Sequence, residues 1–141
     1  MILPKTSKII PNDFRDKDDR GYILSIVDAE ISNVSIIKCN KNSIRSNHYH
    51  KTDSHFMYVL SGEIDYFYKK INDNNVNYFK VTTGQNVFTP PLEIHATYFP
   101  VTTELIVSSI NPRDKKTYEK DTVRIDFINE NNLNIMMDKF N

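Results

Sequence analysis

Cysteine and glycine are both scarce in this sequence of 141 residues, and their scarcity narrows the possible functions. Cys39 is the single cysteine, so the chain cannot form an internal disulfide, which is typical of proteins in a reducing cytoplasm. No motif around Cys39 would make it a nucleophile, and we interpret it as an inert strand residue. With three glycines, neither a Walker-type phosphate loop nor a dinucleotide fingerprint can be assembled.

The sequence also lacks net charge, because 18 lysines and arginines balance 18 aspartates and glutamates. Without a basic excess, or a basic run interleaved with aromatics, we expect no nucleic-acid partner. No stretch approaches the roughly 20 apolar residues of a membrane helix, and the N-terminus has no apolar segment of the signal-peptide kind. We therefore expect a cytoplasmic protein with no membrane partner.

Short runs of β-prone residues, separated by turn residues, recur along the chain. The expected strands cover residues 22–27, 34–39, 56–60, 63–68, 76–81, 86–89, 96–99 and 104–110. Their spacing indicates an all-β sandwich or barrel, and the length suits a single domain over residues 1–141. We expect Ser61 and Gly62 to close a tight hairpin between strands 56–60 and 63–68, because glycine permits a positive φ.

The two ends of the chain have patterns of their own. Residues 1–15 contain Pro4 and Pro11 and suit an arm or an edge strand, and residues 16–21 read as a charged turn. Residues 130–141 are expected to form a short amphipathic helix, with apolar side chains at i, i+3, i+4 and i+7, namely Leu133, Met136, Met137 and Phe140. Its apolar stripe is expected to cap the barrel mouth or to pack on a partner subunit.

All four histidines of the protein fall in two short segments, residues 48–55 and 90–95. His48 and His50 are two residues apart, so on a strand their side chains share a face. A single histidine on an apolar face is usually a hydrogen-bonded core residue, but four in this pattern indicate a common site. Because imidazoles bind divalent transition ions, we predict that Zn, Ni, Fe or Mn is held by His48, His50, His55 and His95.

These two segments resemble the two sequence motifs of the cupin family. The first motif is matched by His48, His50 and Gly62, with His55 at the position usually held by glutamate. The second is matched by Gly84, Pro90 and His95, with Leu92 and Phe99 in place of its second glycine and its asparagine. The resemblance narrows the fold to a double-stranded β-helix, the cupin jelly roll, with a short C-terminal helix. It implies less about function, because cupins include epimerases, isomerases, dioxygenases and binding proteins.

Two further segments resemble cupins that act on nucleotide sugars. Asp18-Asp19-Arg20-Gly21 before a strand is similar to the N-terminal signature of dehydrorhamnose epimerases and sugar 3,4-ketoisomerases. The segment Arg45 to Thr52 resembles both the R-x-x-H-x-H-K of the ketoisomerases and the N-H-x-H-x-T of capsular reductase-epimerase cupin domains. The resemblance implies a nucleotide-sugar substrate and a homodimer with a crossing arm. It implies a metal-free base at His48 in the ketoisomerase pattern and zinc in the capsular one.

The histidine cluster suits isomerisation or epimerisation of a nucleotide-linked keto-deoxy sugar. A cation held by neutral ligands would polarise the carbonyl and favour loss of a proton from the adjacent carbon. A histidine nitrogen bound to the metal cannot accept that proton. Either a histidine such as His48 stays unbound to the metal and accepts it, or a tyrosine or aspartate transfers it. Our candidate tyrosine is Tyr98. Arg45 completes the predicted catalytic set because a guanidinium binds diphosphate bidentately. Strict alternation along a strand would place Arg45 on the opposite face from His48, so this role requires a bulge between the two residues.

Two other functions stay open at this point. Histidine sites with open positions also bind Fe(II) and O₂, so the chain could be an Fe(II)-dependent dioxygenase acting on a small molecule. A non-catalytic cupin that binds a small ligand is the third possibility. Ferrous-dependent oxygen uptake would favour the dioxygenase, whereas solvent deuterium exchange into a nucleotide-linked keto sugar would favour the isomerase.

Overall fold

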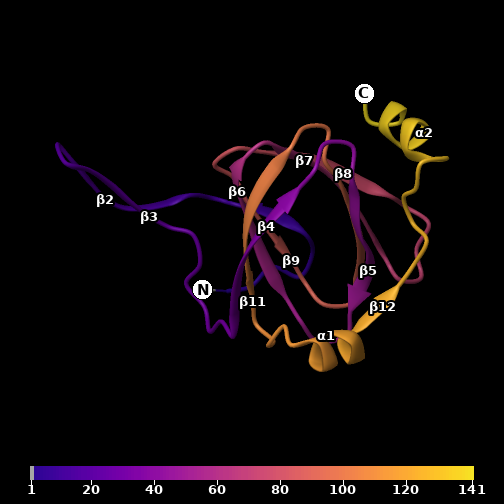
Figure 1. Cartoon of the computed structure of the whole chain (residues 1–141), viewed down its shortest axis with the longest axis horizontal. Coiled ribbons are helices and arrows are strands. Elements are labelled where there is room, and N and C mark those ends of the chain that lie inside the picture. The colour runs from indigo at the N-terminus through magenta and orange to yellow at the C-terminus, as the bar shows by residue number, and fades with distance from the viewer. Residues whose placement is uncertain (1) are drawn as a thin grey trace.

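The computed structural model describes residues 2–141, and its two main sheets are antiparallel with five strands each (Figure 1). In spatial order the first sheet contains β1 (Lys8–Ile10), β9 (Asn86–Thr89), β6 (His55–Ser61), β11 (Thr103–Ser109) and β4 (Asn33–Cys39). The second contains β12 (Thr122–Arg124), β5 (Ile44–His50), β10 (Glu93–Tyr98), β7 (Glu63–Lys70) and β8 (Asn77–Thr82). The predicted double-stranded jelly roll is confirmed.

The main core lies between the two sheets and follows from the alternation of side chains along the strands. Met57 and Val59 of β6 share their parity with His55, and both are buried in this core. Ile64 and Tyr66 of β7 enter it from the opposite sheet, each with no exposed surface. Burying an apolar side chain of this size stabilises a fold by about 1.5–3 kcal/mol. The face that carries a histidine is therefore also the face that packs the core.

Gly62 does not close a hairpin, and this prediction was wrong. β6 pairs with β9 and β11, whereas β7 pairs with β8 and β10, so the chain crosses from one sheet to the other at Gly62. Its φ is +96°, and a Cβ here would lie 2.2 Å from Thr103 Oγ1. A hairpin and a sheet-to-sheet corner both require a positive φ, so the glycine could not tell the two apart.

The N-terminal region contains one strand that joins the jelly roll and two that do not. β1 pairs with β9 at the edge of the first sheet. β2 (Asp13–Asp18) and β3 (Gly21–Ser25) pair only with each other and form a ribbon that extends away from the sheets (Figure 1). The expected charged turn over 16–21 is therefore largely strand. Charged residues are tolerated there because the side chains of β2 are exposed on both faces.

The predicted C-terminal helix is confirmed as α2 (Leu133–Asp138), but its place differs from the expectation. Instead of capping the barrel mouth, its apolar side chains pack beside Phe67 and Ile94, on the outer face of the second sheet. A second helix, α1 (Lys115–Asp121), was not predicted, because seven polar residues show no apolar periodicity. Its sequence signal was the N-cap Asp114, whose carboxylate accepts a hydrogen bond from the Thr117 N–H at 3.1 Å. Neither helix of the described chain could cross a membrane.

Candidate functional site

A bulge in β5 turns Arg45 and His48 toward the same space. β10 pairs His95 with His48 and then Ala96 with Ser46, so Asn47 is an extra residue in β5. Ser46 and Asn47 have φ values of 69° and 55°, in the left-handed region. The side-chain alternation is thereby broken between positions 45 and 48. The bulge that the sequence required is present.

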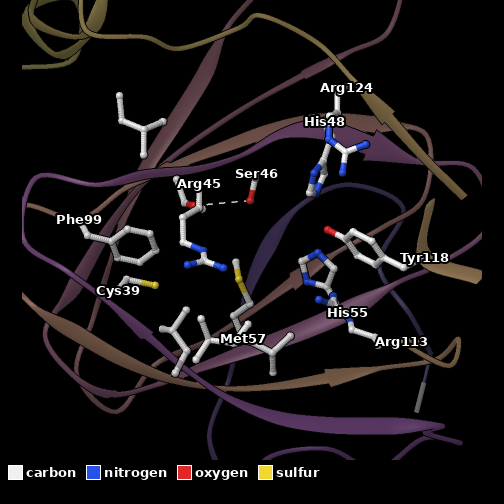
Figure 2. Close-up of a pocket in the computed structure, with 15 residues that line it drawn as sticks. Cys39, Arg45, Ser46, His48, His55, Met57, Phe99, Arg113, Tyr118 and Arg124 are labelled. Atoms are coloured by element: carbon white, nitrogen blue, oxygen red, sulfur yellow. Dashed lines mark hydrogen bonds between the residues drawn. The ribbon is translucent and has the colours of Figure 1, made fainter. Parts of the chain in front are cut away.

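The space that the bulge serves is a cavity of about 410 Å³ between the two sheets. Arg45 and the histidines His48 and His55 line it together with Arg113 and Tyr118. In Figure 2 the Arg45 guanidinium lies between these polar groups and an apolar end that includes Phe99 and Cys39. The apolar wall is completed by Ile37, Ile44, Met57, Leu105 and Val107. The cavity thus has one end lined by charged and polar side chains and one end lined by apolar side chains.

The four histidine rings meet at the polar end of this cavity. The ring centroid of His48 lies 4.6 Å from that of His50 and 4.8 Å from that of His95. One ring nitrogen of each of these three residues lies within 4.8 Å of the others, which is the arrangement of a candidate metal centre. His55 is close, with its centroid 5.4 Å from that of His95, but it is outside this group of three.

Hydrogen bonds at the back of two rings decide which nitrogen faces the cluster. His95 Nδ1 lies 3.1 Å from the carbonyl oxygen of Glu93, which can only accept, so Nδ1 carries the proton. His50 Nδ1 faces the Asp121 carboxylate at 3.4 Å. The Nε2 atoms of His50 and His95 are buried without hydrogen-bond partners. Two lone pairs therefore point into the cluster, as expected of metal ligands held from behind.

All four imidazoles are neutral at neutral pH. Burial is the main cause in each case, and positively charged neighbours add to it. The pKa is lowered to about 2 for His48, about 4 for His50 and about 3 for His95, and the pKa of His55 is also lowered well below its ordinary value. The guanidinium of Arg113 contributes to all four shifts. Neutral imidazole is the form that binds a metal or accepts a proton.

Tyr98, our candidate for proton transfer, is not brought to the cluster. Its neighbours Thr97 and Phe99 line the cavity, so strand alternation turns Tyr98 outward, where its hydroxyl donates to Asn42 Oδ1 at 2.9 Å. Tyr118 of α1 lies at the cluster instead, with its ring centroid 5.5 Å from that of His50. In Figure 2 its hydroxyl points into the cavity between His48 and His55.

Two further residues of the site, Arg113 and Asp121, escaped the sequence reasoning. The Arg113 guanidinium lies over the Tyr118 ring at 5.3 Å, and its Nε donates to Ser109 Oγ at 2.6 Å. The Asp121 carboxylate faces His50 and also accepts the N–H groups of Thr52 at 2.8 Å and Asp53 at 3.0 Å. Arg113 lies just before α1 and Asp121 is its last residue, so both belong to the region of the helix that the hydrophobic pattern did not reveal.

No protein-family model and no curated protein sequence matches the chain. Solved structures do match, among them two sugar 3,4-ketoisomerases. The 3,4-ketoisomerase QdtA from Thermoanaerobacterium thermosaccharolyticum has a TM-score of 0.68 and 17% identity, covering 97% of this chain and 96% of that one. The TDP-quinovose 3,4-ketoisomerase WlaRB from Campylobacter jejuni has a TM-score of 0.70 and 19% identity, covering 86% and 94%.

The capsular polysaccharide assembling protein CapF from Staphylococcus aureus is also similar, with a TM-score of 0.63 and 20% identity. The match covers 84% of this chain but 32% of CapF, so it involves about a third of that larger protein. The resemblance to sugar 3,4-ketoisomerases and to a capsular polysaccharide protein that the sequence motifs suggested is therefore confirmed at the level of the fold. At these identities the likeness establishes the fold alone.

Proposed function

We propose that this chain is an isomerase that moves a proton next to the carbonyl of a nucleotide-linked keto sugar. The observation that carries the proposal is a single cavity lined by neutral histidines and by the arginines Arg45 and Arg113. Such a cavity offers a base for a carbon acid and cations for a diphosphate in one place. Structures of QdtA contain TDP and, in a variant, TDP-4-keto-6-deoxyglucose, which supports this choice of substrate class.

Contact with the cavity divides the roles of the histidines. His48 and His55 line the cavity, whereas His50 and His95 are sealed behind it, 1% and 0% exposed. Only the first pair can reach a substrate, and His48 is the proposed base. Tyr118 directs its hydroxyl into the same space and is the proposed partner that returns the proton. Arg45 and Arg113 hold the diphosphate and so fix the sugar ring against the base.

The cluster also fits a divalent transition ion, because His50 Nε2 and His95 Nε2 are buried without hydrogen-bond partners and one ring nitrogen of each of the three histidines His48, His50 and His95 lies within 4.8 Å of the others. His48, His50 and His95 would hold it, and the ion would supply a Lewis acid for the sugar carbonyl. With His48 so engaged, His55 and Tyr118 are the groups that face the cavity and can move the proton. We also expect a homodimer, since a two-stranded ribbon such as β2–β3 is marginally stable alone in water and exposes Phe14 and Tyr22.

The test is to incubate the protein with TDP-4-keto-6-deoxyglucose in D₂O and to follow the sugar by NMR. We expect deuterium at the carbon next to the carbonyl and formation of a positional keto isomer or an epimer. His48→Asn and Tyr118→Phe should each slow the exchange by about 10²- to 10⁴-fold, the usual effect of losing a general acid or base. Tyr98→Phe is the matched control and should leave the rate unchanged, because its hydroxyl lies outside the cavity. Oxygen uptake dependent on ferrous iron, without any exchange, would replace the proposal with the dioxygenase.

A further inference from the structure

We propose that Ser7, in the N-terminal segment, is a positioning residue for His95, so that this segment completes the site without touching the cavity. The inference deepens the proposed function, because it rests on His95 belonging to the working cluster. Ser7 is 3% exposed and lies directly before β1, 88 residues from His95 in the sequence. It is connected to His95 through two residues, Glu93 and Tyr66, which we call the two supports of His95.

The first support is Glu93, two residues before His95 on β10. Its carboxylate is buried, 5% exposed, and accepts hydrogen bonds from the N–H and the hydroxyl of Ser7 and from the Thr6 hydroxyl. The Ser7 N–H and Thr6 hydroxyl bonds are both 2.9 Å long. Among the described residues no lysine or arginine pairs with Glu93, so these donors are what offsets the cost of burying its charge. The carbonyl of this same residue holds His95 Nδ1.

The second support is Tyr66 of β7, which backs the imidazole itself. The Tyr66 ring is parallel to that of His95, with an angle of 6° between the planes and 6.2 Å between the centroids. Its hydroxyl is buried and shares hydrogen bonds with Ser7 Oγ at 2.8 Å and with Thr89 Oγ1 at 2.6 Å. The Ser7 hydroxyl thus contacts both the residue that fixes the tautomer of His95 and the ring that fixes its plane.

This arrangement makes the orientation of His95 depend on where β1 sits. β1 pairs with the edge of β9 through Lys8, Ile9 and Ile10, which places Ser7 beside Glu93 and Tyr66. Partners behind a metal-binding or catalytic imidazole commonly change affinity or rate by about 10- to 100-fold when they are removed. The hydroxyl group of Ser7 contacts both supports. Its removal should therefore make the orientation of the His95 ring less fixed, while every side chain that lines the cavity stays unchanged.

The experiment compares Ser7→Ala with the native chain by long-range ¹H–¹⁵N spectroscopy of the histidine side chains, at a fixed pH near neutrality. In the native protein we expect His95 as the Nδ1-protonated tautomer. In Ser7→Ala we expect its two nitrogen resonances to move toward each other as the tautomers mix, and kcat to fall about 10-fold with little change in KM. Ser35→Ala is the matched control, since it also removes a serine hydroxyl bond, to Asn33 Oδ1 at 2.7 Å, on the distant strand β4.

Tyr66→Phe gives a second and independent test if Ser7→Ala folds poorly. It keeps the stacked ring and removes the hydroxyl that Ser7 and Thr89 share, so a similar but smaller movement of the His95 resonances is expected. His95 resonances that are the same in both variants as in the native chain would overturn the proposal. If the His95 resonances move in the variants but neither the native protein nor any variant converts the keto sugar, the positioning role stands and the proposed isomerase activity fails.

Discussion

Replacement of Asn47, the extra residue of the β5 bulge, should destabilise the protein strongly. The Asn47 side chain donates to the carbonyl of Ile128 and accepts from the N–H of Ile128, both at 2.9 Å, and Ile128 is 1% exposed. Asn47→Ala leaves this buried N–H and C=O without their partner, at about 1–3 kcal/mol for each group. Alanine at a φ of 55° adds about 1 kcal/mol of left-handed strain that asparagine tolerates better. The expected loss is about 3–7 kcal/mol in the free energy of unfolding.

Asn47→Gly separates the two contributions, because glycine adopts a φ of 55° without strain but makes neither bond to Ile128. Urea unfolding followed by far-UV circular dichroism should rank the native chain first, Asn47→Gly second and Asn47→Ala last, with about 1 kcal/mol between the variants. The bulge also directs Arg45 into the cavity, so we expect KM for the nucleotide sugar to rise in Asn47→Ala. Stability of Asn47→Ala within about 0.5 kcal/mol of the native value would refute this account of the bulge.

Three further predictions concern acid, metal and the sheet-to-sheet corner. In the metal-free protein the unfolded imidazoles protonate below pH 6.5, whereas the folded ones do not until about pH 4 or lower. The free energy of unfolding should therefore fall from pH 6.5 downward, by about 1 kcal/mol per pH unit for each histidine. A urea midpoint that stays constant down to about pH 5 would contradict this. Metal analysis should give about one Zn, Ni, Fe or Mn ion per chain, lost by dialysis from His95→Ala but retained by His55→Ala. Equal loss from both variants would count against the three-histidine centre. Gly62→Ala should lower the free energy of unfolding by about 3 kcal/mol, because its Cβ would meet Thr103 Oγ1 at 2.2 Å. Gly84→Ala is the control: its φ of +85° is similar but a Cβ there meets nothing within 4 Å, so the loss in the same urea assay should be about 1 kcal/mol.

The strands and the meeting of the histidines could be predicted because both depend on local rules. Alternation places His48 and His50 on one face of β5, and it places His55 with the core residues Met57 and Val59 on β6. Spacing between turn residues set the strand limits to within a few residues for most of the jelly roll. The clustering of all four histidines in two short segments added His95, whose ring centroid lies 4.8 Å from that of His48.

Other features of the site depend on partners distant in the sequence, and no local pattern contained them. Tyr98 was chosen for its residue type, but strand alternation turns it to the outside. Tyr118 takes its place because α1 lies against the cluster, held through Asp121 at the N–H groups of residues 52 and 53. The crossing at Gly62 depends on which strands pair, and a glycine with a positive φ serves a hairpin equally well.

The sequence by itself determined an all-β fold and the gathering of four imidazoles inside it, because a period of two residues fixes which side chains face the core. The motif resemblance narrowed that fold to a jelly roll. Tertiary structure alone decided which nitrogen of His50 and His95 faces the cluster, through Asp121 and the Glu93 carbonyl. It also decided that Arg45 shares the cavity with His48, since the bulge that permits this is held by the backbone of Ile128, 81 residues away from Asn47. Hydrogen bonds between distant segments set these orientations, and their geometry exists only once the chain has folded.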